Sequence, residues 1–284
     1  METRWRWILL MCVGGLVSVQ VLSAQKARSF SAPEVEAAAP LQQGLVVSEE
    51  DAQEIGRKVW VNEAGGKVSA LTHWNKGETF ASLGIGHFIW YPAGQEGPFD
   101  ESFPKMLAFV SAQGAKLPQW LSAQGDCPWP DIESFQKDLD SPRMIELRTF
   151  LADTVPLQAR FLALRLEEAL PKILAAAPVR ERTLLQARFY RTASSGSTGL
   201  YALMDYVNFK GEGVKETERY NGQGWGLLQA LEGMKDCDPG PLTLKSFADS
   251  AAAALARRVK NSPPERSEAR WLPGWLKRID TYRR

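Results

Sequence analysis

The stretch that decides the expected fold is Glu63-Ala64-Gly65-Gly66, followed further along by Ser82-Leu83-Gly84-Ile85-Gly86-His87. Two adjacent glycines end a helix, because glycine favours backbone conformations that a helix does not continue through. The residues after this break change to short β-prone pieces, which predict paired strands. A carboxyl group at a helix end is therefore expected beside a glycine-rich hairpin.

The residues before this stretch predict a capped helix. Ser48 can accept a hydrogen bond from the third helical amide, Asp51 can return one, and Val47 supplies the hydrophobic residue that precedes such a cap. Apolar residues then recur at three- and four-residue intervals. We expect this helix to end close to Glu63.

A single small hairpin is expected between Lys67 and Phe88. Asn75-Lys76-Gly77 is the predicted turn between segments 68–74 and 79–88. Strand alternation would place on one side, facing Glu63, the residues Glu78, Phe80, Ser82, Gly84 and Gly86.

Helices dominate the rest of the chain. Expected helices run over 104–114, from Ser141-Pro142 onward and over 157–177. The fold class is therefore α+β and predominantly α-helical, with helical lobes and one small β-hairpin. Residues 1–24 are expected to be a signal peptide or membrane anchor, 25–46 a flexible linker, and 47–284 one domain with a basic extension from about 262.

Composition excludes several function classes. A formal net charge of +1 argues against nucleic-acid binding through a general positive field. Only His73 and His87 are present, and the exported part holds only Cys127 and Cys237, so we expect neither a metal nor a cofactor. One disulfide between these cysteines and two separate thiols remain equal alternatives. Nine Lys or Arg residues over 257–284 favour a solvated helical face over attraction to an anionic polymer or membrane.

The catalytic chemistry that these exclusions leave is that of carboxyl groups. A glycosidase needs a carboxylic acid that stays protonated near neutral pH, and partial burial achieves this. Glu63 suits the role at the end of an apolar stripe, with Glu78 and Ser82 expected as assisting groups in the same cleft. Gly84 and Gly86 would let a sugar ring approach the backbone. The alternative is a helix terminus followed by a β-bulge.

This pattern resembles the phage-type lysozymes of the lysozyme-like superfamily, from about Ser48 to Phe88. The resemblance implies that Glu63 is the general acid, that Ser82 occupies the position of a Thr, and that His87 is the hairpin's closing histidine. Lys76 stands where that family has Asp. Without a second carboxylate, the chemistry would resemble that of a lytic transglycosylase.

A second group of polar and glycine residues lies downstream, in 205–213 and 220–229. Gly226-Leu227-Leu228-Gln229 resembles a signature of soluble lytic transglycosylases and goose-type lysozymes, which makes Glu212 a rival catalytic acid. We prefer Glu63, because only Glu63 combines a capped helix with a following hairpin. The downstream residues are then expected to bind substrate, together with His87: Asn208, Lys210, Glu212, Tyr220, Gln223, Trp225 and Gln229.

The leading expectation is an exported enzyme, periplasmic or extracellular and soluble or tethered at its N-terminus, that cleaves β-1,4 glycosidic bonds of peptidoglycan. The alternatives are a non-catalytic cell-wall-binding protein with the same fold and a chitosanase-like glycosidase. The sequence leaves the oligomeric state open.

Overall fold

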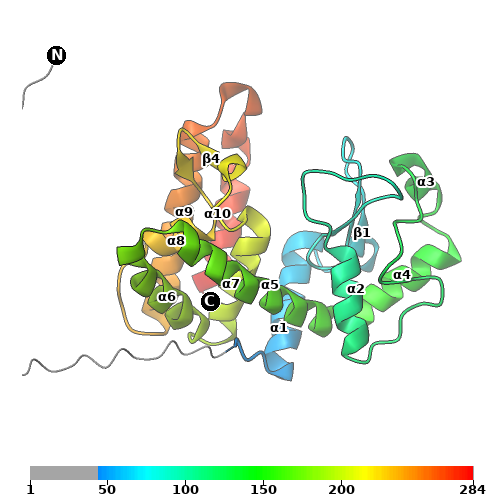
Figure 1. Ribbon diagram of the computed structural model, residues 1–284, viewed down its shortest axis with the longest axis horizontal. Helices are drawn as coiled ribbons and strands as arrows, with labels where there is room; N and C mark the ends of the chain where they lie inside the picture. Colours follow the sequence, from blue (N-terminus) through cyan, green and yellow to red (C-terminus); the bar gives the residue numbers. More distant parts are fainter. Residues whose placement is uncertain (1–43, 284) are drawn as a thin grey trace, which may run out of the picture. The chain divides into compact units, whose positions relative to one another are not determined.

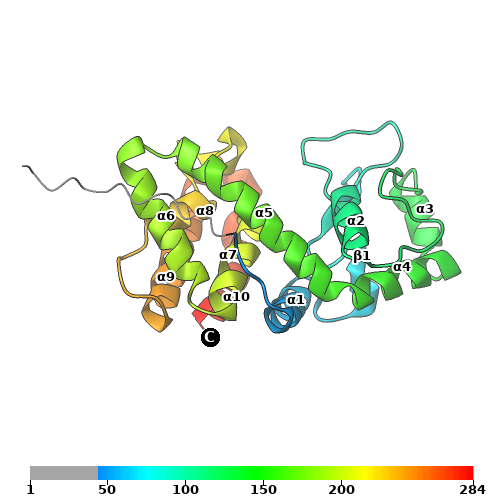
Figure 2. The same cartoon turned by 60° about the horizontal axis from the view of Figure 1, so that its bottom comes forward.

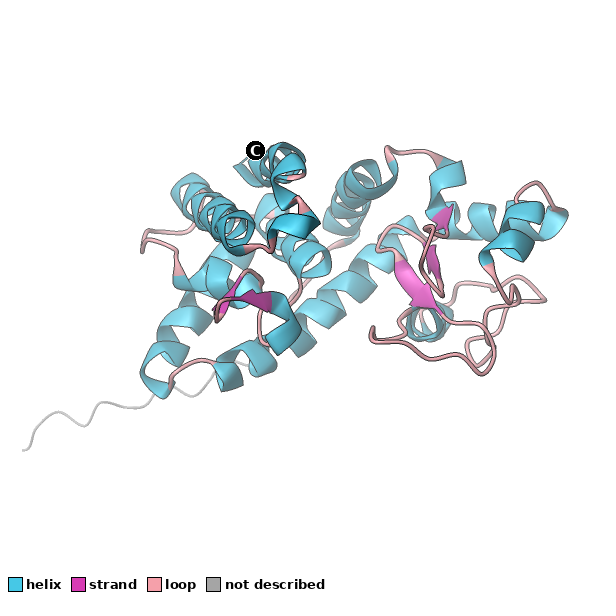
Figure 3. Ribbon diagram, turned by 90° about the horizontal axis from the view of Figure 1, so that it is seen from above, coloured by secondary structure: helices cyan, strands magenta, loops and turns pink. Residues whose placement is uncertain are grey.

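Helices make up most of the part of the chain that the computed structural model describes, residues 44–283, and two small antiparallel sheets accompany them (Figure 1, Figure 3). The expected class, α+β and predominantly helical, is confirmed. The expected signal segment 1–24 and nearly all of the expected linker 25–46 lie outside the described residues. Within 44–283, no helix combines the length and apolar character needed to cross a bilayer.

Helix α1, Glu49–Ala64, forms as its local sequence predicts. Ser48 is the N-cap, and its Oγ accepts from the Asp51 amide at 3.0 Å. Gly65 ends the helix in the left-handed conformation, with φ 59°, where glycine carries no steric penalty. These two ends place Glu63 in the last turn.

The expected single hairpin is wrong, because the structure has two hairpins in one three-stranded sheet. The sheet follows a short 3₁₀ helix, Val68–Leu71, and its antiparallel order is β1-β2-β3, with β1 Thr72–His73, β2 Ala81–Leu83 and β3 Phe88–Trp90. The expected second strand stops at Leu83. Gly84 and His87 have φ of 71° and 48°, so 84–87 is the turn between β2 and β3. The expected alternation of side chains therefore does not extend into this turn.

The remaining helices and strands are α5 and the elements of the two groups that α5 connects. They are α2 Phe103–Ala112, α3 Ile132–Lys137, α4 Pro142–Asp153, α5 Val155–Ala176, α6 Val179–Ala193, α7 Ser197–Lys210, β4 Arg219–Tyr220, β5 Gln223–Gly224, α8 Leu227–Glu232, α9 Pro241–Asn261 and α10 Leu272–Asp280. Three expected helices correspond to α2, α4 and α5, and Ser141 caps α4 as expected, accepting from the Met144 amide at 3.1 Å.

Helix α5 connects the two groups, running from the side of the sheet, α2 and α4 to the side of α6 (Figure 2). Its first turn packs closely on α1 at Gly56. A Cβ at Gly56 would lie 2.7 Å from Val155 Cγ1, so glycine permits this close approach. Because α1 and α5 are in direct contact, the end of α1 has a fixed position relative to α5.

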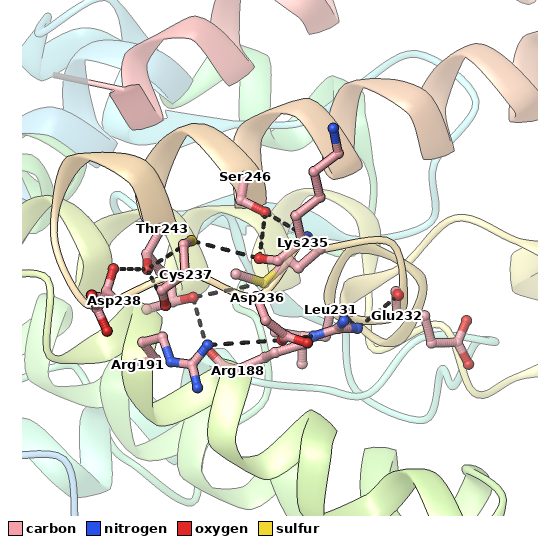
Figure 4. Close-up of polar contacts among 12 residues, drawn as sticks. Arg188, Arg191, Leu231, Glu232, Lys235, Asp236, Cys237, Asp238, Thr243 and Ser246 are labelled. Carbon is pink, nitrogen blue, oxygen red and sulfur yellow. Dashed lines mark hydrogen bonds and ion pairs between the residues drawn. The ribbon is translucent and has the colours of Figure 1, made fainter.

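The two cysteines are separate thiols. Cys127 is buried beside the sheet, and burial raises its pKa to about 12. Cys237 lies in the loop between α8 and α9, where its Sγ is 3.4 Å from Thr243 Oγ1 (Figure 4). Arg188 holds the same loop, donating to the Leu231 and Glu232 carbonyls and to Asp236 (Figure 4). Of the two alternatives, the structure has the separate thiols.

The basic C-terminal segment is only partly a solvated face. Arg257, Lys260 and Lys277 are exposed. Arg258 and Arg278 instead point inward and pair with carboxylates whose side chains are fully buried. Tyr282, near the end of the chain, is completely buried against Tyr206 and Phe247. This segment is therefore part of the helical core around α7 and α9.

Candidate active site

A cleft with a volume of about 490 Å³ lies where the end of α1, the β2–β3 turn, α5 and the end of α7 meet; we call it the main cleft. A neighbouring cavity of about 470 Å³, the side cavity, shares several of its lining residues. The shared residues include Asp100, Arg165, Asn208, Lys215 and Glu218. A polymer could therefore contact both spaces through one continuous set of side chains.

Glu63 lines the main cleft, and its side chain is only 13% exposed. Arg278 donates from Nη2 to Glu63 Oε1. The same guanidinium donates two hydrogen bonds of 2.8 Å to Asp205, one to each carboxylate oxygen. Asp205 is fully buried and also accepts from the Tyr282 hydroxyl at 2.6 Å. Arg278 is thus shared between a cleft carboxylate and a core carboxylate.

Arg278 remains a cation in this position. Burial alone would lower its pKa, but Asp205 and Glu63 outweigh burial and raise the pKa above its ordinary value. Its guanidinium also lies 4.1 Å from the Phe209 ring centroid, a cation–π arrangement. Because Asp205 already neutralises Arg278, Glu63 does not face an unopposed positive charge.

His87 lies against the other side of Glu63. Its Nδ1 is 3.8 Å from Glu63 Oε2, and both residues line the main cleft. Burial lowers the pKa of His87 below its ordinary value, and the attraction of Glu63 opposes that effect only in part. At neutral pH the imidazole is therefore mainly neutral and can act as a hydrogen-bonding neighbour of the acid.

Glu78 and Ser82, the expected assisting groups, line neither cavity. Glu78 lies in the connection between β1 and β2, where its Oε2 accepts from Asn75 Nδ2 at 3.0 Å. Ser82 is 6% exposed and sits in the middle strand, paired with His73 and Ile89. Because β2 begins only at Ala81, strand alternation does not apply to Glu78, and Ser82 is a buried residue of the sheet.

The two glycines of the turn are required by packing. A Cβ at Gly84 would lie 2.4 Å from Gln158 Oε1, the oxygen that accepts from the Ile85 amide at 3.0 Å. A Cβ at Gly86 would lie 2.6 Å from the Phe88 ring. Gly86 also lines the main cleft, whereas Gly84 does not.

Part of the downstream group reaches the cavities. Asn208 and Lys210 line the main cleft. Glu212, the rival acid, lines the side cavity, where Lys172 pairs with it at 2.8 Å. The two candidate acids therefore lie in adjoining spaces, and only Glu63 faces the β2–β3 turn.

Four other downstream residues make internal contacts and line neither cavity. Tyr220 donates to Glu268 at 2.9 Å, and Gln223 accepts from Asn261 at 3.0 Å. Trp225 is 5% exposed, and Arg258 lies 4.2 Å from its ring centroid. These contacts stabilise the wall of the cleft.

The fourth, Gln229, explains the glycine density of this region. Its Oε1 accepts from the Gly226 amide at 3.0 Å, and its Nε2 donates to the Gly213 carbonyl at 3.2 Å. A Cβ at Gly226 would lie 2.1 Å from the Gly213 nitrogen. Close backbone packing around one buried amide therefore accounts for these glycines.

Sequence reasoning missed several residues that line the cleft or hold Glu63 in place. Asp205 carried a local signal, because an acidic residue within the otherwise apolar stretch 200–207 is unusual unless it has a buried partner. Arg278 carried no local signal of its contact with Glu63, because the two residues are 215 positions apart. Asp100 and Arg165, which line both cavities, also stood outside any recognisable motif. In residues 44–283, no group of three or more His, Cys, Asp or Glu side chains is arranged to hold a metal ion.

In comparisons with known proteins, no family model, no curated protein and no solved structure shows significant similarity to the chain.

Proposed function

We propose that this protein is an exported enzyme that cleaves the β-1,4 glycosidic bonds of peptidoglycan, with Glu63 as the general acid. The observation that carries the proposal is the position of Glu63. Its carboxyl group is mostly buried at the end of α1 and lines a cleft of about 490 Å³, within the size range of small-molecule sites. A general acid of this kind protonates the leaving oxygen of a glycosidic bond.

The arrangement around Glu63 supports a lysozyme-like fold. The helix-end acid faces the Gly84-Ile85-Gly86-His87 turn, with His87 as its neighbour, as the resemblance of the sequence implies. Helix α5 lies between the sheet side and the larger helical group, and the cleft opens where these meet. The inward-facing residues of α7 supply the opposite wall.

The role of a second carboxylate distinguishes hydrolysis from transglycosylation. Besides Glu63, the carboxylates that line the described part of the main cleft are Asp100 and Glu218. Asp100 pairs with Lys105 at 2.7 Å, and Glu218 accepts from the Gly213 amide at 2.7 Å. Hydrolysis requires one of them to activate water, whereas a lytic transglycosylase closes an anhydro ring with the sugar's own hydroxyl.

The test compares purified wild type, Glu63→Gln and Glu212→Gln on isolated sacculi. Because loss of a positioned general acid costs roughly 10²- to 10⁴-fold in rate, Glu63→Gln is expected to lose nearly all release of soluble fragments. Glu212→Gln tests the rival acid in the adjoining cavity, and loss of release by Glu212→Gln alone would move the assignment to Glu212. Mass spectrometry of the products separates reducing ends from anhydro ends. Full release by Glu63→Gln would overturn the assignment.

The ion pair between Glu63 and Arg278 favours one alternative, a wall-binding protein that does not cleave. The guanidinium that pairs with Glu63 competes with a glycosidic oxygen for the same carboxyl group. This alternative expects wild type to bind sacculi without releasing fragments, so the same assay distinguishes the two functions.

A further inference from the structure

Three basic side chains of the main cleft, those of Lys210, Arg165 and Lys215, form no ion pair in the described chain. Lys210 is 8% exposed, and within residues 44–283 its Nζ has neither a hydrogen-bond acceptor nor an ion-pair partner. Arg165 lines both the main cleft and the side cavity and likewise forms no ion pair in the described chain. Buried basic groups are normally paired, so unpaired basic side chains in one cleft favour an anion as the ligand that completes their interactions.

The surroundings fix the position of Lys210. Its Nζ lies 3.7 Å from the Phe209 ring centroid and 3.5 Å from the Trp275 ring centroid. These ring faces supply no hydrogen-bond acceptor, which leaves the cleft as the side from which a partner can approach. Burial, followed by the charges of Arg258 and Arg278, lowers the pKa of Lys210 to about 6. Glu268 and Glu63 oppose this lowering only in part, so a bound anion would favour the protonated form of the amine.

The other charged groups of the main cleft are already compensated. Glu63 pairs with Arg278, Asp100 pairs with Lys105 at 2.7 Å, and Arg258 pairs with Glu268 at 2.8 Å. The last carboxylate, Glu218, accepts from the amides of Gly213 and Lys215. Arg165 and Lys215 are therefore the cleft cations without an ion pair, and Lys210 is a buried amine that can take up a proton when an anion binds beside it.

We infer that Lys210 and Arg165 form a carboxylate-binding subsite, which makes the cleft selective for glycans that carry carboxylate groups. The inference rests on the proposed function and names its substrate class. A guanidinium and an amine that takes up a proton as the anion binds together suit a carboxylate, since each then donates charge-assisted hydrogen bonds to it. They disfavour a polycationic glycan such as chitosan, whose amino groups would repel them. In peptidoglycan the carboxylate comes from the lactyl group of the sugar or from the attached peptide.

The test measures binding in the Glu63→Gln background, where turnover does not consume the substrate. The probes are intact sacculi, sacculi whose carboxyl groups have been reduced to alcohols, and peptide-free glycan strands that keep only the lactyl carboxylate. Glu63→Gln is expected to bind intact sacculi roughly 10- to 100-fold more tightly than reduced sacculi, the range of one charge-assisted hydrogen bond. Strong binding to peptide-free strands assigns the sugar carboxylate, and weak binding assigns the peptide.

Adding Lys210→Met is expected to remove most of this preference while leaving binding to reduced sacculi unchanged. Lys210→Arg provides a cationic hydrogen-bond donor at the same position and is expected to keep the preference, which covers the case in which Lys210→Met does not fold. Lys116→Met, at an exposed position outside both cavities, is the control. Equal binding to intact and reduced sacculi, or a preference that survives Lys210→Met, overturns the inference. Failure of wild type to release fragments would overturn only the proposed catalysis, because binding is measured separately.

Discussion

Replacing Glu268 tests how the cleft wall is held. The Glu268 side chain is fully buried and accepts four hydrogen bonds. Arg258 donates two of them, each 2.8 Å long, and Arg266 and Tyr220 donate one each, at 3.2 and 2.9 Å. Since Arg258 also lines the main cleft, this carboxylate connects the C-terminal segment to the site.

Glu268→Gln preserves the shape of the side chain and removes its charge. The new amide can still accept at one oxygen, but its NH₂ group faces a donor of Arg258, so at least one buried hydrogen bond is lost. Breaking a buried ion pair by removing one partner costs about 3–5 kcal/mol. Arg258 can still stack on Trp225 in the variant, which keeps part of its stabilisation. We therefore expect the free energy of unfolding to fall by about 3 kcal/mol, the lower end of that range.

Urea unfolding at neutral pH measures this loss, with Glu265→Gln as the control, because Glu265 is exposed three positions away. Burial acts to raise the pKa of Glu268, but hydrogen bonds from Arg258 and Tyr220 outweigh it, so the pKa lies below its ordinary value of 4.5. The unfolded chain therefore takes up this proton first as the pH falls. Wild type and variant should converge below pH 4.5. A Glu268→Gln protein as stable as Glu265→Gln would refute the reasoning.

Two further perturbations test the site and its support. The folded pKa of Lys210, about 6, lies below the ordinary 10.5, so the unfolded state binds more protons between these values and wild-type stability should rise with pH in this window. Lys210→Met should flatten that rise by up to about 1.4 kcal/mol per pH unit in urea unfolding measured across the window, and parallel curves would contradict it. Gly84→Ala should destabilise by about 2–4 kcal/mol, because φ is 71° and the new Cβ would meet Gln158 Oε1 at 2.4 Å. Gly77 is also at positive φ, but a Cβ there would have no atom within 4 Å, so Gly77→Ala should cost only about 1–2 kcal/mol. Thermal unfolding of both variants measures the two losses, and equal losses would contradict the packing argument.

The features predicted well from sequence are local ones. The cap at Ser48, the left-handed Gly65 and the apolar stripe between them act within a few residues, so α1 and the position of Glu63 follow directly from the sequence. The start of α4 at Ser141-Pro142 is the same kind of signal. Local capping chemistry thus located the candidate acid.

The second hairpin was not predictable by the same rules. Its turn places His87, a non-glycine residue, at φ 48°, and it holds Gly84 against Gln158 from α5, 74 positions away. Tertiary contact with α5 therefore decides where β2 ends. Because the alternation argument assumed a continuous strand, it assigned Glu78 and Ser82 to a cleft that they do not line.

The electrostatic setting of Glu63 depends on the C-terminal segment, which a sequence pattern presents as an appendage after Ser262-Pro263-Pro264. Arg278 belongs to that segment and joins Glu63 to Asp205 on α7, while Tyr282 donates to the same Asp205. Without the segment, Asp205 would be a buried carboxylate with no cation, which is costly enough to disrupt α7 itself. The end of α7 carries Asn208 and Lys210 into the cleft. The proposed acid and the proposed carboxylate subsite are therefore both held in place by the C-terminal segment, through Arg278 on α10 and Tyr282 just after it.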